Sequence, residues 1–240
     1  MKRFDVLTIG LQVIDLMIPG MDGHILDREM TLLDHAELTL GGDALNQAIV
    51  LSQLGARTAL MGAAGVDRLG DVLLQQLSRY PLSVFDRRID VPTAICVVLI
   101  DEAHERHFLF QPGQNLALRY EDLDEAVIRD SAFVSVGGAM ALPELTGETG
   151  SPEKMAQALH KMGAADGIEA HIPSFPCRCV DTTGAGDTFV GSFLYAKSQG
   201  WDTLASAKFA CAAGSVAVEH VGANTAIRSK DQVLARMNGQ

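Results

Sequence analysis

The sequence predicts an α/β sandwich around a mainly parallel β-sheet, with a second, smaller β layer beside it. Short apolar runs alternate with helical patterns up to residue 136, and strands that alternate with helices are typical of parallel sheets. Four further β-prone stretches, near 15–18, 36–40, 94–100 and 107–111, fit the smaller layer. The last third of the chain has helical periodicity and supplies helices to cover the sheet.

The first elements follow from apolar periodicity and from glycine. Residues 4–9 form an apolar run that ends at Gly10, which predicts a buried strand. Residues 15–40 alternate irregularly and contain several turn residues, so we expect short strands and turns there. A helix is predicted over 44–54, because its apolar residues recur at helical spacing and Gly55 is suited to end it.

The remaining elements are predicted in the same way. We expect a strand over 58–61, a helix over 69–77, strands over 93–100 and 107–111, a short helix beginning at Asp122 and a buried strand over 132–136. The stretch 177–180 is β-prone and predicts one more strand. Helices are expected over 184–198, 202–220 and 229–237.

Composition excludes several function classes. The chain has 240 residues, 48% of them hydrophobic, which is enough for one substantial core. A net charge of −11 argues against nucleic acid or an anionic membrane as partner, since both attract basic surfaces. No apolar run reaches 18 residues and the N-terminus does not resemble a signal peptide, so we expect a cytoplasmic protein.

The four cysteines do not suggest a metal site. They are Cys96, Cys177, Cys179 and Cys211. Zinc sites usually use Cys-x-x-Cys pairs or partner histidines, and the sequence contains neither arrangement. We therefore expect buried, reduced thiols.

The run 181–193, Asp-Thr-Thr-Gly-Ala-Gly-Asp-Thr-Phe-Val-Gly-Ser-Phe, is the most informative part of the chain. Its small residues Gly184, Ala185 and Gly186 open a helix, where unpaired N–H groups and the helix dipole favour an anion. Asp187 lies in the first turn, and a carboxylate beside a bound phosphate is suited to deprotonate an attacking hydroxyl. A tight turn capped by Asp187 is the structural alternative.

A second glycine motif precedes the helix at 44–54. Gly41 and Gly42 allow close approach of the backbone to a ligand, and Asn46 offers both a donor and an acceptor to a hydroxyl. Taken alone, this motif is more typical of an ordinary glycine-rich helix start with a solvent-facing Asn. Asp67 and Asp71, around Gly70, are expected to build a turn and cap a helix rather than bind metal.

Together these motifs resemble the ribokinase-like (PfkB) family of sugar and nucleoside kinases. The run 181–193 is similar to the family's C-terminal signature, and its N-terminal half is matched in order by Gly41-Gly42-x-x-x-Asn46, Leu54-Gly55-Ala56 and Gly62-x-x-Gly65-x-Asp67-x-x-Gly70. The resemblance covers residues 4–136 and 176–237. It implies one ribokinase-like domain over 1–240, a three-layer α/β/α sandwich with lid strands inserted from about 12–40 and 93–112.

The resemblance also implies a role for each matching residue. Asp187 corresponds to the catalytic base, and the backbone of Gly184, Ala185 and Gly186 to the anion hole. The acceptor hydroxyls are expected to bind at Asp15, Gly41, Gly42 and Asn46. Thr183 and Asn224 are expected beside the nucleotide, and Asp181 with Thr183 resembles the loop that binds a monovalent cation in many members.

The function implied is an ATP-dependent kinase that phosphorylates a primary hydroxyl of a monosaccharide or related polyol. ATP and Mg²⁺ are the expected cofactors, with K⁺ as the candidate monovalent cation, and the lid is expected to form a homodimer. A nucleoside kinase of the same fold and a non-catalytic sugar-binding relative are the alternatives. Neither G-x-G-x-x-G after the first strand nor G-x-x-x-x-G-K-[ST] is present, which argues against a dehydrogenase and a P-loop enzyme.

The middle of the chain departs from the family pattern. Between residue 138 and the 181–193 run the chain is shorter than several βα units of about thirty residues each require. The Asn-x-x-Glu element and the strand ending in Gly-x-x-Gly are absent, and two joins, near 141–144 and 163–165, look abrupt. Either tracts of the protein are missing from the sequence there, or the deletion is real and the chain is a non-catalytic relative.

Overall fold

A parallel four-stranded sheet forms the centre of the protein in the computed structural model, which describes residues 2–102, 105–137 and 172–239. Its strand order is β10 (Ser131–Gly137), β1 (Phe4–Gly10), β4 (Thr58–Met61) and β6 (Leu82–Val84). All three pairings are parallel, with Leu7 of β1 opposite Val134 and Ala59. The prediction of a mainly parallel sheet is confirmed.

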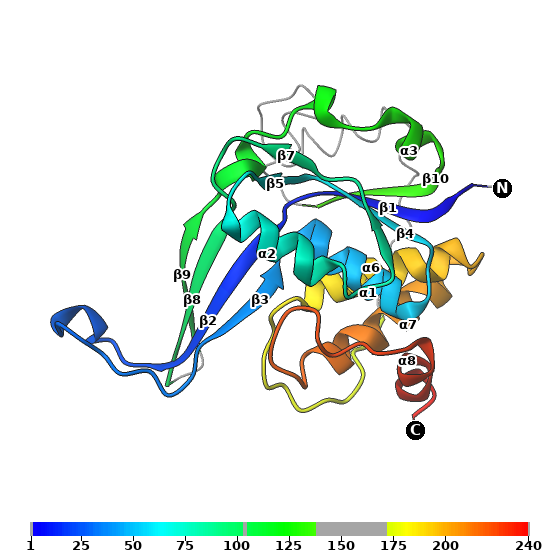
Figure 1. Ribbon diagram of the computed structural model, residues 1–240. Coiled ribbons are helices and arrows are strands. Elements are labelled where there is room, and N and C mark those ends of the chain that lie inside the picture. The colour runs from blue at the N-terminus through cyan, green and yellow to red at the C-terminus, as the bar shows by residue number, and fades with distance from the viewer. Residues whose placement is uncertain (1, 103–104, 138–171, 240) are drawn as a thin grey trace, which may run out of the picture.

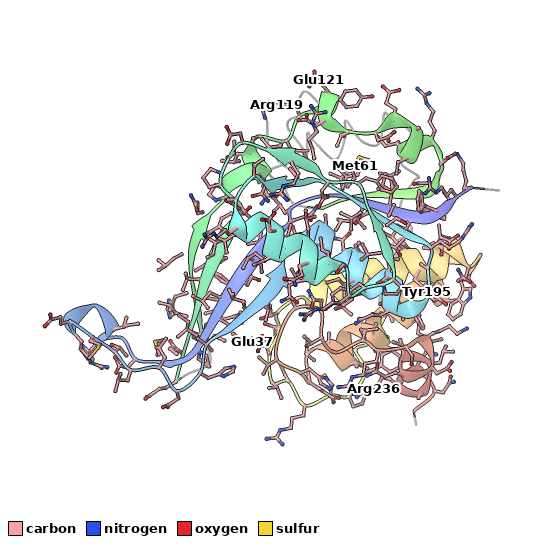
Figure 2. The ribbon with its side chains drawn as sticks, viewed as in Figure 1. Glu37, Met61, Arg119, Glu121, Tyr195 and Arg236 are labelled. Carbon is pink, nitrogen blue, oxygen red and sulfur yellow. The ribbon has the colours of Figure 1, made fainter. Side chains whose placement is uncertain are left out.

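Helices cover both faces of this sheet, as Figure 1 shows. On one face lie α1 (Asp43–Leu54), α2 (Arg68–Leu77), α6 (Ala185–Ser198) and α7 (Thr203–Ala217), with α8 (Lys230–Met237) packed on α7. On the other lies α3 (Glu125–Arg129). In Figure 2, Met61 lies at the face covered by α3 and Tyr195 lies among the helices of the opposite layer. The three-layer sandwich is confirmed.

A second sheet projects from the first and forms the predicted lid (Figure 1). This lid sheet has the order β3 (Glu37–Gly41), β2 (Val13–Met21), β8 (Ile95–Asp101) and β9 (Arg106–Gln111). Its central pair, β2 and β8, is parallel and the outer pairs are antiparallel. β9 is an edge strand whose residues Phe108, Leu109 and Phe110 are exposed.

Several short elements have no clear signal in the sequence. They are the strands β5 (Ala63–Gly65), β6 and β7 (Arg87–Ile89), and the 3₁₀ turns η1 (Ile25–Asp27), η2 (Gly113–Leu116) and η3 (Tyr120–Asp122). Three or four residues are too few to establish an alternating or helical pattern. β5 and β7 exist because they pair with each other, which is a long-range event.

Two predicted helix boundaries are wrong by a few residues. The short helix α3 begins at Glu125 rather than Asp122, because Asp124 is its cap and accepts hydrogen bonds from the N–H groups of Ala126 and Val127. α7 ends at Ala217 rather than near residue 220. The cap expected of Asp67 is confirmed, since its carboxylate accepts from Gly70 N–H at 2.7 Å.

The predicted strand over 177–180 is wrong, and so is the burial of its cysteines. This segment is irregular, and the N–H groups of Val180 and Asp181 both donate to Val218 O, just beyond α7, instead of to a strand. Without a sheet around them Cys177 and Cys179 are exposed. Cys96 is buried as expected, on the lid strand β8, and Cys211 is half-buried.

The two abrupt joins near 141–144 and 163–165 lie outside the described residues. Within the described part of the chain, no helix combines the length and the apolar character that crossing a bilayer requires.

Candidate active site

The N-terminus of α6 presents unpaired backbone donors. Gly184 precedes the helix in a left-handed conformation, φ +68°, and a Cβ there would lie 2.0 Å from Ala223 O. Among the described residues, no hydrogen bond is recorded for the N–H groups of Gly184, Gly186 and Asp187, whereas Ala185 N–H bonds to Thr182 O at 3.3 Å. Such donors at a helix N-terminus bind anions. Of the predicted anion hole, Gly184 and Gly186 have free N–H groups and Ala185 does not.

Two amide side chains from α1 hold the Asp187 carboxylate. Asn46 Nδ2 donates to Asp187 Oδ2 at 3.0 Å, and Gln47 Nε2 donates to Asp187 Oδ1 at 3.4 Å. One oxygen thus faces each amide, so the carboxylate is fixed in orientation. α1 and α6 pack closely, which brings residues some 140 positions apart into contact.

Each amide is in turn held by a further residue. Asn46 Oδ1 accepts from Asn224 Nδ2 at 2.7 Å, and the same Asn224 amide donates to Leu40 O at 3.0 Å. Gln47 Oε1 accepts from Ser135 Oγ at 2.7 Å. Asn224 is buried and therefore positions Asn46 here, while the contact with nucleotide that its sequence motif implies stays a prediction.

The environment of Asp187 makes it a better base than an ordinary carboxylate. Burial raises its pKa to about 6, and the charge of Asp43 adds to the rise, while the hydrogen bonds from Asn46 and Gln47 oppose it. At pH 7 the group is still ionised, because its pKa lies below that pH. It can accept a proton more readily than a solvated aspartate of pKa 3.8.

Asp15 lies on the lid strand β2, beside the glycines that begin α1. A Cβ at Gly41 would lie 2.0 Å from Asp15 Oδ2, so glycine is required there for the carboxylate to fit. Gly42 has φ +94°, and a Cβ there would lie 2.5 Å from Leu11 O. Burial raises the pKa of Asp15 to about 6, and no donor among the described residues is recorded at its carboxylate. Its oxygens are thus available to ligand hydroxyl groups.

We expect Asp15→Asn to stabilise the ligand-free protein at pH 8. The pKa of Asp15 is raised from 3.8 to about 6, so the ionised group lowers the free energy of unfolding progressively between these two pH values and fully above pH 6. The gain is on the order of 2 kcal/mol at pH 8 and small at pH 4. Thermal unfolding at both pH values measures it. Equal melting temperatures of the two proteins at pH 8 would contradict the burial of a charged Asp15.

Asp181 and Thr183 form a compact loop before α6. Asp181 Oδ1 accepts from Thr183 N at 2.8 Å and from Thr183 Oγ1 at 2.5 Å, and Asp181 Oδ2 accepts from Gly222 N at 2.9 Å. Arg106, from the lid strand β9, donates to Thr183 Oγ1 and to Thr182 Oγ1. The loop that sequence assigns to a cation and a nucleotide therefore contacts the lid directly.

The structure brings the predicted residues to one end of the fold. Asn46 contacts Asp187, Gly41 contacts Asp15, and Asn224 contacts Asn46. Sequence reasoning missed three residues of this region: Gln47, Ser135 and Arg106. A signal existed for Gln47, which follows Asn46 in the same helix, and for Arg106, a cation in the lid of an acidic chain.

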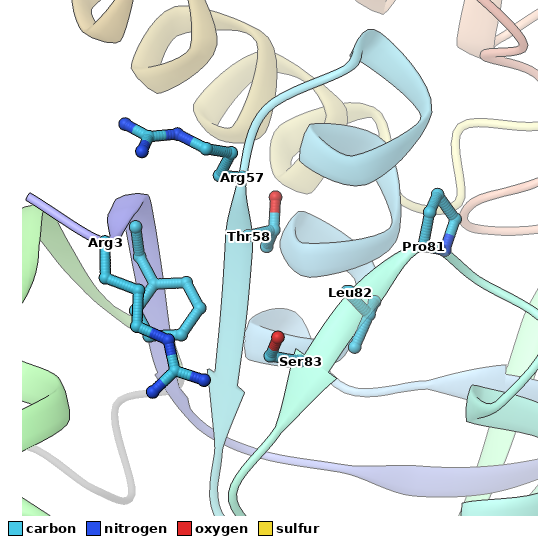
Figure 3. A pocket seen from close by; sticks show the side chains of 7 residues that line it. Arg3, Arg57, Thr58, Pro81, Leu82 and Ser83 are labelled. Carbon is cyan, nitrogen blue, oxygen red and sulfur yellow. The ribbon is translucent and has the colours of Figure 1, made fainter.

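A different cavity lies at the opposite end of the parallel sheet. It has a volume of about 390 Å³ at the amino ends of β1, β4 and β6, and Figure 3 shows its lining residues. Arg57 there is paired with Asp5 at 2.5 Å, and the Arg3 guanidinium stacks on Phe4. Because parallel sheets bind ligands at the carboxyl ends of their strands, the end with Asp187 is the candidate active site.

The described residues offer no ready-made divalent metal cage. No group of three or more His, Cys, Asp or Glu side chains converges among them. The unpaired N–H groups at α6 fit phosphate oxygens, and Mg²⁺ commonly reaches proteins on substrate phosphates with few protein ligands. The helix N-terminus therefore fits the phosphate oxygens of a ligand.

Known proteins resemble this chain over most of its length. A family model described as pfkB family carbohydrate kinase matches residues 4–175 and 166–230. Ribokinase of Bacillus subtilis is 24% identical over an alignment of 289 positions that covers 95% of this chain and 98% of that protein. The probable fructokinase-4 of Arabidopsis thaliana is 32% identical over 108 residues, 43% of this chain and 33% of that protein.

Solved structures share the fold at low identity. The fructokinase of Xylella fastidiosa with bound ATP has a TM-score of 0.75 at 19% identity and covers 98% of this chain and 99% of its own. Ribokinase of Thermotoga maritima has a TM-score of 0.72 at 18% identity, with coverages of 98% and 99%. A Methanocaldococcus jannaschii nucleoside kinase has a TM-score of 0.71 at 16% identity and covers 100% of each chain.

Proposed function

Because the chain belongs to the pfkB family of carbohydrate kinases, we propose that it transfers the γ-phosphoryl group of ATP to a primary hydroxyl of a monosaccharide or related polyol. The observation that carries the proposal is the Asp187 carboxylate. It is fixed by two amides and has a raised pKa, next to unpaired N–H groups at the start of α6. A base beside an anion site is the arrangement that phosphoryl transfer to an alcohol requires.

In the proposed mechanism the acceptor lies between the lid and α1. Asp15 accepts hydrogen bonds from sugar hydroxyls, since its carboxylate has no recorded donor among the described residues. Asn46 donates its remaining amide hydrogen to the acceptor. Gly41 and Gly42 allow the backbone to approach the acceptor closely. Asp187 takes the proton of the attacking hydroxyl, and the N–H groups of Gly184 and Gly186 bind the phosphoryl oxygens. Mg²⁺, when bound with ATP, neutralises charge on the phosphates.

A sugar is the preferred acceptor over a nucleoside. A nucleoside needs an aromatic wall for its base. Residues 15–40, which include most of lid strands β2 and β3, contain no aromatic residue, and the exposed lid aromatics Phe108 and Phe110 lie on the edge strand β9. Ribokinase and fructokinase relatives at low identity support a sugar in general and do not single one out. A nucleoside kinase and a non-catalytic sugar-binding protein remain the competing functions.

A phosphorylation screen tests the proposal. Ketoses, aldoses, keto-sugar acids and nucleosides would each be offered with Mg-ATP, and ADP formation measured against an acceptor-free control. We expect turnover with at least one sugar class and none with nucleosides. Turnover confined to nucleosides would mean that the acceptor is a nucleoside and not a sugar. No turnover with any class would favour the non-catalytic function.

We also propose a homodimer formed through the lid. β9 is an edge strand with three exposed apolar residues, Phe108, Leu109 and Phe110, and unpaired edges favour strand pairing between copies. Light scattering after size-exclusion chromatography tests this. A mass near twice 25.6 kDa is expected, and Leu109→Lys on the exposed edge should lower it to the monomer value.

A further inference from the structure

One cationic side chain from the lid contacts the Asp181–Thr183 loop. The Arg106 guanidinium donates to Thr183 Oγ1, donates to Thr182 Oγ1 at 3.1 Å and lies 3.8 Å from Asp181 Oδ1. No other lysine or arginine of the described residues has a recorded contact with residues 181–187. The Arg106 side chain is 26% exposed and that of Asp181 11%, so the pair is shielded from water on most sides.

The carboxylates near this loop would repel a bound anion unless a cation lay beside them. Asp181 and Asp187 are six residues apart, and the chain as a whole carries a charge of −11. Burial works to raise the pKa of Asp181, but the hydrogen bonds from Gly222 and Thr183 and the charge of Arg106 outweigh burial and lower the pKa. Asp181 is therefore ionised, and a polyanion bound at α6 would be repelled by it without a compensating cation.

The oxygens that sequence assigns to a monovalent cation are already engaged. Thr183 Oγ1 donates to Asp181 and accepts from Arg106, and both Asp181 oxygens accept from backbone N–H groups. A potassium ion is held by several oxygens that replace its hydration shell, and it would have to displace the guanidinium to use these. With Arg106 bound to Thr183 Oγ1, the side-chain oxygens of Asp181 and Thr183 are not free to surround a monovalent cation.

The lid geometry keeps Arg106 in this position. Its guanidinium carbon lies 5.9 Å from the ring centre of Phe108, two residues along the same strand. A cavity of about 430 Å³ opens between the lid and the loop, lined by both Arg106 and residues 179–182. The side chain thus spans from the lid sheet to the loop across this cavity.

From these contacts we infer that the Arg106 guanidinium takes the place of a monovalent cation at the Asp181–Thr183 loop, so that this kinase requires no potassium. Arginine stays charged at every working pH, and its planar group bonds two oxygens at once. The inference rests on the proposed kinase function for its activity readout. It also makes Arg106 a positioning residue, which sets the loop through Thr182 and Thr183.

The activity test compares K⁺, Na⁺ and choline chlorides at equal ionic strength, with Mg-ATP and the acceptor found by the screen. The wild-type rate is expected to agree within about twofold in all three salts. Arg106→Gln is expected to lose about tenfold or more in choline, the scale of one charge-assisted contact, and to recover in K⁺. The activity of Arg106→Lys in choline should fall between those of the wild type and Arg106→Gln, since lysine keeps the charge but lacks the planar group that bonds two oxygens. Arg28→Gln, which removes a lid arginine paired with Asp22, is the matched control and should behave as wild type.

Thermal unfolding supplies a readout that needs no turnover. The ligand-free wild type should melt at the same temperature in K⁺ and choline, whereas Arg106→Gln should gain about 2 °C or more in K⁺ through cation binding. Potassium activation or potassium-specific stabilisation of the wild type would overturn the inference. So would an Arg106→Gln variant whose activity and melting temperature are the same in K⁺ and in choline. Should the screen find no acceptor, the proposed function fails while the melting comparison still decides on Arg106.

Discussion

Asp187→Asn is expected to lower turnover at least about a hundredfold while sugar binding persists, the usual lower scale of help from acid–base catalysis. The side chain keeps its size, and one amide oxygen still accepts from Asn46 or Gln47, so the packing of α1 on α6 is retained. What is lost is the group that takes the proton of the attacking hydroxyl. Steady-state ADP release measures turnover, and sugar-induced thermal stabilisation measures binding. Near-normal turnover would remove Asp187 from the mechanism.

The pH profile of the wild type gives a second measurement on the same group. Because the pKa of Asp187 is raised to about 6, kcat/KM should increase with pH and level off above pH 7. Asp43→Asn is the matched control: it removes a neighbouring charge that raises the pKa of Asp187, so the rise should move to lower pH while most activity is kept. If kcat/KM of Asp43→Asn rises at the same pH as that of the wild type, a group other than Asp187 controls the rise.

Alanine substitutions at Gly184 and Gly186, two residues apart, should have opposite effects on stability. Gly184→Ala places a Cβ 2.0 Å from Ala223 O in a left-handed conformation, φ +68°, so we expect a loss of about 2 kcal/mol or more together with loss of activity. At Gly186 an added Cβ would have no atom of the other described residues within 4 Å, apart from its chain neighbours and its own helix turn. Gly186→Ala should therefore fold normally, with a gain of about 0.5–1 kcal/mol from helix propensity.

The functional effect of Gly186→Ala separates an anion site from an ordinary helix start. The open space beside Gly186 is the space that phosphoryl oxygens would occupy, so the added methyl should reduce kcat/KM for ATP by about tenfold or more. Denaturant unfolding and ATP titration measure the two effects on one preparation. A stable, fully active Gly186→Ala would show that the N-terminus of α6 does not bind the phosphoryl group.

Local signals predicted the starts of α1, α2 and α6 to within one residue. The glycines before α1 and α6 and the cap at Asp67 depend on residues within one or two turns of the chain. Strand 177–180 failed for the complementary reason. Its β-prone residues have no sheet partner among the described residues, and the N–H groups of Val180 and of the next residue, Asp181, donate to Val218 O instead.

The sequence by itself determined the α/β architecture, the lid strands and the candidate base Asp187, because periodicity, glycine and a short motif carry that information locally. Only the tertiary structure decided what surrounds the base. Gln47 reaches Asp187 across 140 residues, Ser135 reaches Gln47 across 88, and Arg106 reaches Thr183 across 77. Those contacts arise from helix packing and lid placement, which bring distant side chains together, and no spacing along the chain encodes them.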